Sequence, residues 1–324
     1  MSDFKNSISK ANRIMVAGHI RPDGDCIGAC IALHYYIQNN FPGKTTDIYL
    51  ETLPERFLPL DPERSIVADQ ISSDPYDLFI AVDCSSSDRL GKAGQAFLQA
   101  EKTICVDHHI SNASYADENF LTPDSSSTCE VLFELMGEDA LVPEIAAPLY
   151  VGIAYDSGVF RYSNTSARTM EIAGKLIQTG IPFWELIDRC ISQRTYKQTQ
   201  LLGRTLQSSL RLLDGKCIVG MITMHMMQLY GAKTEDIDGI IEQLRVTEGV
   251  EVAILLFELS EMEYKVSMRS NGFIDVSQIA VHFSGGGHKK AAGFQMDGSL
   301  YDVINGITEY LEQQLDTEGI IWME

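Results

Sequence analysis

The chain offers one carboxylate and two imidazoles in three consecutive residues. Asp107, His108 and His109 directly follow the apolar run 103–106. A short apolar run with β-branched residues and no polar alternation is typical of a strand buried on both faces. Because α/β folds carry their chemistry at the carboxyl ends of parallel strands, this triplet is a candidate ligand set for a divalent transition metal. The alternative is a strand that ends in solvent with a polar tripeptide.

A second candidate group lies in the loop after the first predicted strand, 13–17. His19, Asp23 and Asp25 are spaced by four and two residues, which lets three side chains of one turn converge on one point. A proline and a glycine in this loop provide the unusual backbone that such a turn needs. Asp25 also stands where the N-cap of the following apolar helix is expected. The alternative is an ordinary turn before a capped helix.

Two further acids follow apolar elements. Asp83 comes directly after the buried run 77–82, and Asp156 ends the helical, mostly apolar stretch 143–155. Separate elements thus deliver acids or imidazoles at the same kind of position, which packing alone does not explain. Carboxylate and imidazole ligands suit Mn²⁺, with Mg²⁺, Co²⁺ or Zn²⁺ as competitors, and this many ligands suit two ions about 4 Å apart. The groups so placed are His19, Asp23, Asp25, Asp83, Asp107, His108, His109 and Asp156.

The elements that must position these groups predict two α/β domains. At 324 residues the chain is long enough for both. Buried strands alternating with helices predict a parallel sheet in an N-terminal domain, 1–190. The polar, amphipathic stretch 183–212 predicts one long helix, so that 191–214 connects the domains. Strand-like and helical runs then predict a smaller α/β domain over 215–324.

The predicted second domain carries a candidate anion site. Gly285, Gly286 and Gly287 leave backbone N–H groups free to close on an anion, and His288 and two lysines follow directly. The residues after the glycines read as a helix start, which would add to the attraction. The alternative is a flexible surface turn. A hydroxyl-rich stretch in the first domain, 124–130, reads first as a helix N-cap and second as a phosphate contact.

Charge and cysteine content limit the classes of protein to which this chain can belong. The formal net charge of −20 argues against a protein that coats long or duplex nucleic acid by neutralising phosphates, but it does not exclude a small anionic substrate. No apolar run approaches the length of a membrane span, and residues 1–10 lack the apolar core of a signal peptide. The seven cysteines form no Cys-x-x-Cys pair, and Cys26 and Cys30 read as packed thiols rather than ligands. These features predict a cytoplasmic protein without disulfides.

Six stretches together resemble the DHH/DHHA1 phosphoesterase family. The chain is most similar to the branch that contains nanoRNases with pAp-phosphatase activity and cyclic-dinucleotide phosphodiesterases, and it is too short for a RecJ-type exonuclease. The resemblance implies an N-terminal parallel-sheet DHH domain and a C-terminal DHHA1 domain, with the active site in the cleft between them. The matching stretches are 18–28, 81–85, 106–112, 152–165, 269–276 and 285–293.

The resemblance also implies a role for each site residue. It implies two divalent ions, with Mn²⁺ as the first choice and Mg²⁺ or Co²⁺ as alternatives. Asp83 would be a ligand of both ions. His109 would face the substrate phosphate, and Asp107 would orient a histidine. One ion would be held by His19, Asp23 and Asp83, and the other by Asp25, Asp83, His108 and Asp156. The far end of the substrate would be held by Arg269, Ser270, Gly285, Gly286, Gly287 and His288.

The resulting hypothesis is a hydrolase for short oligoribonucleotides or dinucleotides, with pAp phosphatase as a second activity. A hydroxide that bridges the two metals would attack phosphorus, and the nucleoside oxygen would leave. A cyclic di-AMP phosphodiesterase and a pyrophosphatase are the rival enzymes, and a catalytically silent nucleotide sensor is the rival of another class. Members of this family are often dimers, which makes a homodimer a candidate assembly.

Overall fold

The computed structural model describes residues 3–63, 66, 71–72 and 74–321, with only the backbone for 316–321. The chain divides into two compact units, Met1–Gln193 and Arg194–Glu324. The outermost residues of the two predicted domains, 1–2 and 322–324, lie outside the described residues. Within the described chain no helix is long and apolar enough to cross a membrane.

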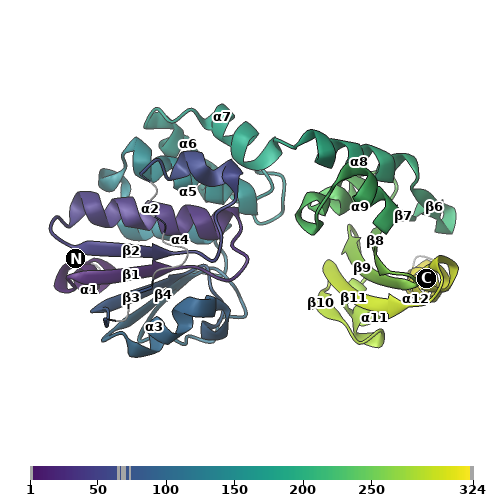
Figure 1. Cartoon of the computed structure of the whole chain (residues 1–324), viewed down its shortest axis with the longest axis horizontal. Coiled ribbons are helices and arrows are strands. Elements are labelled where there is room, and N and C mark those ends of the chain that lie inside the picture. Colours follow the sequence, from purple (N-terminus) through teal and green to yellow (C-terminus); the bar gives the residue numbers. More distant parts are fainter. Residues whose placement is uncertain (1–2, 64–65, 67–70, 73, 322–324) are drawn as a thin grey trace. The chain divides into compact units, whose positions relative to one another are not determined.

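The first unit contains a five-stranded sheet in the order β2-β1-β3-β4-β5, and every neighbouring pair of strands is parallel (Figure 1). The parallel sheet expected from the buried apolar runs is therefore confirmed. All residues of β3 and β4 are buried, as a strand covered on both faces requires. The strands are β1 (Arg13–Ala17), β2 (Thr45–Tyr49), β3 (Leu78–Val82), β4 (Thr103–Asp107) and β5 (Glu118–Leu121).

Helices cover both faces of this sheet, because successive side chains of a strand point to opposite sides. Ile14 and Val16 of β1 belong to the larger core, whereas Met15 and Ala17 belong to the smaller core around α3. Figure 1 shows α2, α5 and α6 on one side of the sheet and α3 on the other. The helices are α1 (Asp3–Lys10), α2 (Gly24–Asn40), α3 (Gly94–Gln99), α4 (Thr128–Met136), α5 (Pro143–Asp156), α6 (Ala167–Gln178) and α7 (Phe183–Ile187).

Two glycines let α2, α4 and α5 approach closely enough to meet at the site. A Cβ atom at Gly28 would lie 2.4 Å from the carbonyl oxygen of Pro148 in α5. A Cβ atom at Gly152 would lie 2.2 Å from Cys129 Sγ in α4 and 2.9 Å from Asp25 Oδ1 in α2. Neither distance can be tolerated by a larger residue, so the glycines set how near the three helices come to one another.

The predicted long helix over 183–212 is wrong. After α7, a π-helical turn covers Asp188–Ser192, and Gln193 has an extended backbone that ends it. Helix α8 (Tyr196–Gln207) then begins behind a Thr195 N-cap. Its buried Leu201 packs into a core of the second unit, so α8 is part of that unit and not a free connector.

The second unit contains a six-stranded sheet in the order β10-β11-β9-β8-β7-β6, in which only β7 and β8 pair in parallel. Helices α8, α9 and α10 share one core with the sheet, and α11 and α12 share the other. The predicted second α/β domain is thus confirmed. Its strands are β6 (Leu210–Leu212), β7 (Cys217–Ile222), β8 (Val252–Ser260), β9 (Glu263–Ser270), β10 (Gly286–His288) and β11 (Ala291–Asp297). Its remaining helices are α9 (Met224–Tyr230), α10 (Ile240–Arg245), α11 (Val276–His282) and α12 (Leu300–Ile321).

Candidate metal centre

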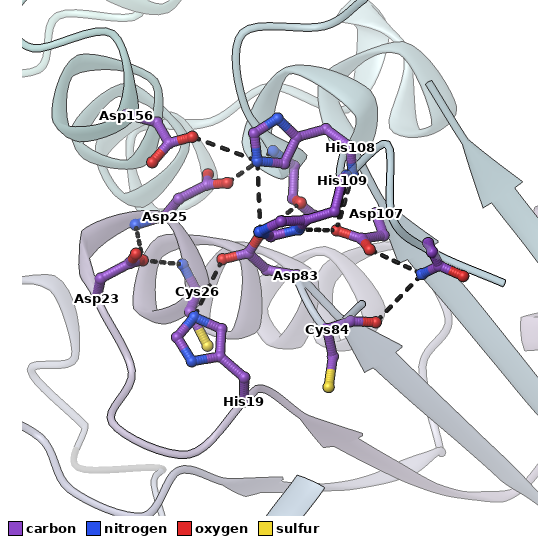
Figure 2. Close-up of polar contacts among 12 residues, drawn as sticks. His19, Asp23, Asp25, Cys26, Asp83, Cys84, Asp107, His108, His109 and Asp156 are labelled. Atoms are coloured by element: carbon purple, nitrogen blue, oxygen red, sulfur yellow. Dashed lines mark hydrogen bonds and ion pairs between the residues drawn. The ribbon is translucent and has the colours of Figure 1, made fainter. Parts of the chain in front are cut away.

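The acids and imidazoles predicted in the first unit converge at the carboxyl edge of its sheet (Figure 2). They come from the segments after β1, β3 and β4, from the start of α2 and from the end of α5. Among the residues that the structure describes, three groups each have donor atoms within 4.8 Å of one another. Asp83 belongs to two of these groups, and His108 also belongs to two. These groups are His19–Cys26–Asp83, Asp83–His108–His109 and Asp25–His108–Asp156.

The start of α2 holds two of the acids in different ways. Asp23 is the N-cap, because its Oδ1 accepts hydrogen bonds from the backbone N–H groups of Asp25 and Cys26, both at 3.1 Å. The predicted N-cap, Asp25, is wrong: it lies within the first turn of the helix and is fully buried. Its side chain is therefore free to face the site and not the end of its own helix.

The start of α4 is built around Asp25. The N–H of Thr128 donates to Asp25 Oδ2 at 2.6 Å, and the N–H of Cys129 donates to Asp25 Oδ1 at 3.0 Å. Ser127 is the N-cap of α4 and accepts from the N–H of Glu130, which confirms the cap predicted in 124–130. The alternative of a phosphate contact is not supported, because the carboxylate of Asp25 already occupies the anion site at this helix start.

Asp83 lies at the centre of the cluster and has an unusual backbone. Its φ of 54° is in the left-handed region, which non-glycine residues adopt rarely and mostly where surrounding contacts hold them. The buried hydroxyl of Thr128 donates to Asp83 Oδ1 at 2.9 Å. Asp83 Oδ2 lies 3.5 Å from His19 Nε2, and Oδ1 lies 3.8 Å from His108 Nε2. Asp83 thus faces imidazoles from two different loops.

The two histidines present the same ring atom to the carboxylates. The backbone carbonyl of Ile20 lies 2.8 Å from His19 Nδ1, and that of Ser125 lies 3.3 Å from His108 Nδ1. When Nδ1–H donates to the carbonyl, Nε2 is the ring atom that faces the carboxylates, and its lone pair becomes available to an ion once Nε2 has no proton. A carbonyl behind the ring is the arrangement that commonly orients a metal-binding histidine.

The spacing of the donors fits divalent ions. Donors that share an ion at about 2.0–2.3 Å lie roughly 3.0–3.5 Å apart at tetrahedral or octahedral angles. His19 Nε2 and Asp83 Oδ2 are 3.5 Å apart, and His108 Nε2 and Asp156 Oδ2 are 3.3 Å apart. Both pairs could therefore close on an ion with little movement.

The pKa values of the acids in the cluster also favour the binding of cations. Burial, and then the charge of Asp83, raises the pKa of Asp156 to about 8, and the same two effects raise the pKa values of Asp23 and Asp25. Burial opposes ionisation of Asp83 too, but its hydrogen bond with His19 holds its pKa below the usual value. Burial lowers the pKa of His19, but the contacts with Asp83, Cys26 and the carbonyl of Ile20 together outweigh burial and raise that pKa to about 11. Without metal, protons thus neutralise much of a buried cluster of negative charge, and divalent ions can replace them.

His109 is held differently from the other two histidines. Its Nδ1 lies 2.6 Å from Asp107 Oδ1, and its side chain is 34% exposed. The hydrogen bond to Asp107 raises the pKa of His109 to about 8. Asp107 is fully buried, and its other oxygen accepts a 2.7 Å hydrogen bond from Asn112. Asn112, Asp107 and His109 therefore form a chain of hydrogen bonds that leads from the protein interior to a partly exposed imidazole.

Sequence reasoning missed three residues that contact this cluster. From the sequence, Cys26 is interpreted as a packed thiol, Thr128 only as part of the hydroxyl-rich stretch 124–130, and Asn112 only as the last residue of the stretch 106–112. The signals were present, since Cys26 directly follows Asp25, and Asn112 is three residues after His109. The hydroxyl-rich stretch predicts a cap or a phosphate contact but not the hydrogen bond to Asp83, because that contact joins residues 45 apart in the chain.

The residues predicted to hold substrate lie on β9, β10 and β11 of the second unit. The guanidinium of Arg269 donates from Nε to Glu242 Oε1 at 2.9 Å. Ser270 is only 5% exposed and shares the buried side of β9 with Val266 and Met268. Since successive strand residues point to opposite faces, Ser270 and Arg269 do not present their side chains to the same side.

The predicted helix after the three glycines is wrong. Gly286–His288 and Ala291–Asp297 form an antiparallel pair, with Lys289 and Lys290 in the connection. Gly287 has φ of 144°, and a Cβ atom there would lie 2.5 Å from the carbonyl oxygen of Ala291. The glycines thus serve close strand pairing. His288 and both lysines are exposed, but no helix start adds to their attraction for an anion.

Comparison with known families agrees with the fold and the site. Residues 13–153 match the N-terminal domain of the DHH family, and residues 217–317 match the DHHA1 domain. The chain therefore belongs to the DHH/DHHA1 family. The predicted resemblance is confirmed.

The relatives and the solved structure described next are similar over nearly the full chain. The bifunctional oligoribonuclease and PAP phosphatase NrnA of Thermus thermophilus is 29% identical over 314 residues, which cover 95% of this chain and 92% of the relative. The protein of the same name from Bacillus subtilis is 24% identical, over 90% of this chain and 92% of the relative. The crystal structure of an exopolyphosphatase-related protein from Bacteroides fragilis has a TM-score of 0.86 at 22% identity, over 96% of this chain and 95% of that one. The last comparison shows a shared fold.

Proposed function

We propose that the protein is a metal-dependent hydrolase that cleaves short oligoribonucleotides and also removes phosphate from pAp. The observation that carries the proposal is the set of buried carboxylates and Nε2-presenting histidines around Asp83. The substrate class is supported by relatives named as oligoribonucleases and PAP phosphatases that align over nearly the whole chain. We further propose Mn²⁺ as the preferred ion, because the site is mainly carboxylate and imidazole.

Bound divalent ions would polarise the phosphoryl group and lower the pKa of an attacking water. The residues proposed to hold them are His19, Asp23, Asp25, Asp83, His108 and Asp156. Of these, Asp83 has a special position, because its two oxygens face different histidines. Thr128 and the start of α4 keep the carboxylates of Asp83 and Asp25 in fixed orientations.

We propose that the protonated Nε2 of His109 donates a hydrogen bond to the substrate phosphate. Its Nδ1 is engaged by Asp107, so Nε2 is the ring atom left for a ligand. With its pKa raised to about 8 by Asp107, the imidazole is largely protonated at neutral pH. A cationic donor next to a phosphoryl group stabilises the charge that develops there during hydrolysis. Asp107 acts through His109, by orienting the ring and supporting its positive charge.

We propose that the second domain holds the far end of the substrate. The proposed contacts come from exposed cations and backbone N–H groups around the β10–β11 pair, with Arg269 on the neighbouring strand. They are Arg269, Gly285, Gly286, Gly287 and His288; the predicted contact from the side chain of Ser270 is not retained, because that side chain lies on the buried side of β9. All seven cysteines are free, which supports a reducing compartment such as the cytoplasm.

The test is hydrolysis, with Mn²⁺, of a panel of substrates: pApA, a short RNA of about five nucleotides, pAp, cyclic di-AMP and pyrophosphate. Fast turnover of the linear substrates and phosphate release from pAp are expected, and both should be lost in Asp83→Asn. Preference for cyclic di-AMP or for pyrophosphate would replace the proposed substrate. Metal binding without turnover of any compound would support the nucleotide sensor.

A further inference from the structure

We infer that Cys26 supplies a sulfur ligand to the ion held by His19 and Asp83, so that this position takes thiophilic ions such as Zn²⁺ and Co²⁺ in preference to Mg²⁺. The inference rests on the proposed metal centre and limits the preference for Mn²⁺ to the position of Asp25, His108 and Asp156, which has only oxygen and nitrogen donors. Among the described residues, Cys26 is the one cysteine that lies in a group of three potential metal donors.

The geometry brings the sulfur within reach of a shared ion. The Sγ atom of Cys26, a ring nitrogen of His19 and a carboxylate oxygen of Asp83 all lie within 4.8 Å of one another. Two donors bound to one ion at about 2.0–2.3 Å lie roughly 3.0–3.5 Å apart at tetrahedral or octahedral angles, so the three side chains would have to close on a shared ion by adjusting their torsion angles. The three side chains are 0%, 5% and 2% exposed, so the protein and not solvent surrounds this position.

The local fold holds the thiol in one place. The N–H of Cys26 donates to the capping carboxylate of Asp23 at 3.1 Å, which ties the first turn of α2 to another proposed ligand. A Cβ atom at Gly18 would lie 2.1 Å from Cys26 Sγ, so glycine at the end of β1 makes room for the sulfur beside His19. Figure 2 shows the Cys26 side chain on the same side of the cluster as His19.

A sulfur ligand gives a metal site a different ion preference from a site with only oxygen and nitrogen donors. A metal-binding cysteine coordinates as thiolate, so the S–H bond breaks, its proton goes to solvent and a sulfur–metal bond forms with the remaining electron pair. Thiolate ligands favour Zn²⁺ and Co²⁺ over Mg²⁺ and Mn²⁺. The alternative is that Cys26 only fills space in the core, where free cysteines are common.

Titration with Co²⁺ distinguishes a metal-binding Cys26 from a Cys26 that only packs in the core, without an activity assay. Wild-type protein freed of metal by a chelator is titrated with Co²⁺ and followed by absorption. A thiolate ligand gives a sulfur-to-cobalt charge-transfer band in the near ultraviolet, in addition to the weaker visible bands of bound Co²⁺. We expect the charge-transfer band in wild type and in Cys30→Ser, and its loss in Cys26→Ser with the visible bands kept. Cys30 is the matched control, because it is buried one turn further along the same helix.

A second readout compares two ions in the same variants. Cys26→Ser should weaken Zn²⁺ binding by about tenfold or more, since even outer contacts of a metal site cost 10–100-fold. Mn²⁺ binding should change much less, and Cys26→Ala, which needs no hydrogen-bond partner, should behave like Cys26→Ser. Visible bands without the charge-transfer band in wild type would overturn the role of Cys26 and leave the proposed function intact. Absence of all Co²⁺ bands, together with no binding of Mn²⁺, would overturn the metal centre itself.

Discussion

Thr128→Val removes one donor from the centre of the site and nearly nothing else. Valine has the shape of threonine and also branches at Cβ, so the fully buried side chain at the start of α4 keeps its volume. The backbone N–H of residue 128 continues to donate to Asp25. What is lost is the 2.9 Å hydrogen bond from the hydroxyl to Asp83 Oδ1. The variant therefore tests whether this contact prepares Asp83 to bind metal.

The expected magnitude follows from the charge and burial of the acceptor. A hydrogen bond to a charged group contributes about 1.5–3 kcal/mol, which corresponds to roughly 10–150-fold in an equilibrium constant. Part of that energy is lost in the metal-free protein as well, because Asp83 is 2% exposed and water cannot easily replace the hydroxyl. Outer contacts of metal ligands typically change metal affinity by 10–100-fold. We therefore expect Mn²⁺ affinity to fall by about tenfold or more, with a lower melting temperature of the metal-free protein.

Isothermal titration calorimetry of chelator-treated protein with Mn²⁺ measures this effect, and Thr128→Ser is the control. Serine keeps the hydroxyl but loses the methyl group, so it should bind Mn²⁺ nearly as wild type does. If Thr128→Val binds as tightly as wild type while Thr128→Ser binds worse, the methyl packing matters and the hydrogen bond does not. That result would refute the idea that the start of α4 orients the central carboxylate.

Other perturbations have distinct outcomes. Asp83→Asn keeps the shape of the side chain but should abolish hydrolysis and bind far less Mn²⁺ by metal analysis, whereas His288→Ala should weaken substrate binding with the metal content unchanged. Asp107→Asn should lower the pKa of His109 from about 8, so the alkaline limb of the pH–rate profile should move to lower pH; an unchanged limb would mean that another group sets it. Burial and the charge of Asp83 raise the folded-state pKa of Asp156 to about 8, above its ordinary value of about 4. The folded metal-free protein therefore binds more protons than the unfolded chain, and its melting temperature should fall as pH rises from about 4 to 8. Saturating Mn²⁺ should remove that fall, and a stripped protein that grows more stable over this range would contradict the arrangement of carboxylates.

Much of the fold was predictable because the buried strands are apolar on both faces. Runs such as Leu78–Val82 and Thr103–Asp107 have no polar alternation, and a parallel sheet covered by helices is the structure that accommodates them. The stretch 183–212 wrongly predicts one helix, because its amphipathic pattern continues through a break between two helices. Gln193 has an extended backbone, and a new helix begins after the N-cap Thr195. The local backbone conformation therefore ends the first helix, although the hydrophobic periodicity continues.

The second domain shows a different limit. Three glycines followed by lysines and alanines fit both a helix start and a tight strand pair, because glycine permits either backbone. Pairing with β9 decides the matter: Ala291–Asp297 lies against Glu263–Ser270 in a continuous antiparallel register. Such a partner lies more than twenty residues away in the chain and carries no local signal.

The proposed metal ligands could be identified from strand ends, but what holds them in place could not. Asp25 and Thr128 are 103 residues apart, yet a backbone N–H at the start of α4 contacts the Asp25 carboxylate at 2.6 Å. Read locally, the serines and threonine before Glu130 cap a helix, and they do. The same turn also neutralises part of a buried anion and donates to Asp83, because a helix start attracts whichever negative group the tertiary fold brings to it. Two sources of positive charge therefore stabilise the ionised acids of this site. One is the start of α4, which is part of the fold, and the other is the divalent ions that we propose bind among the acids.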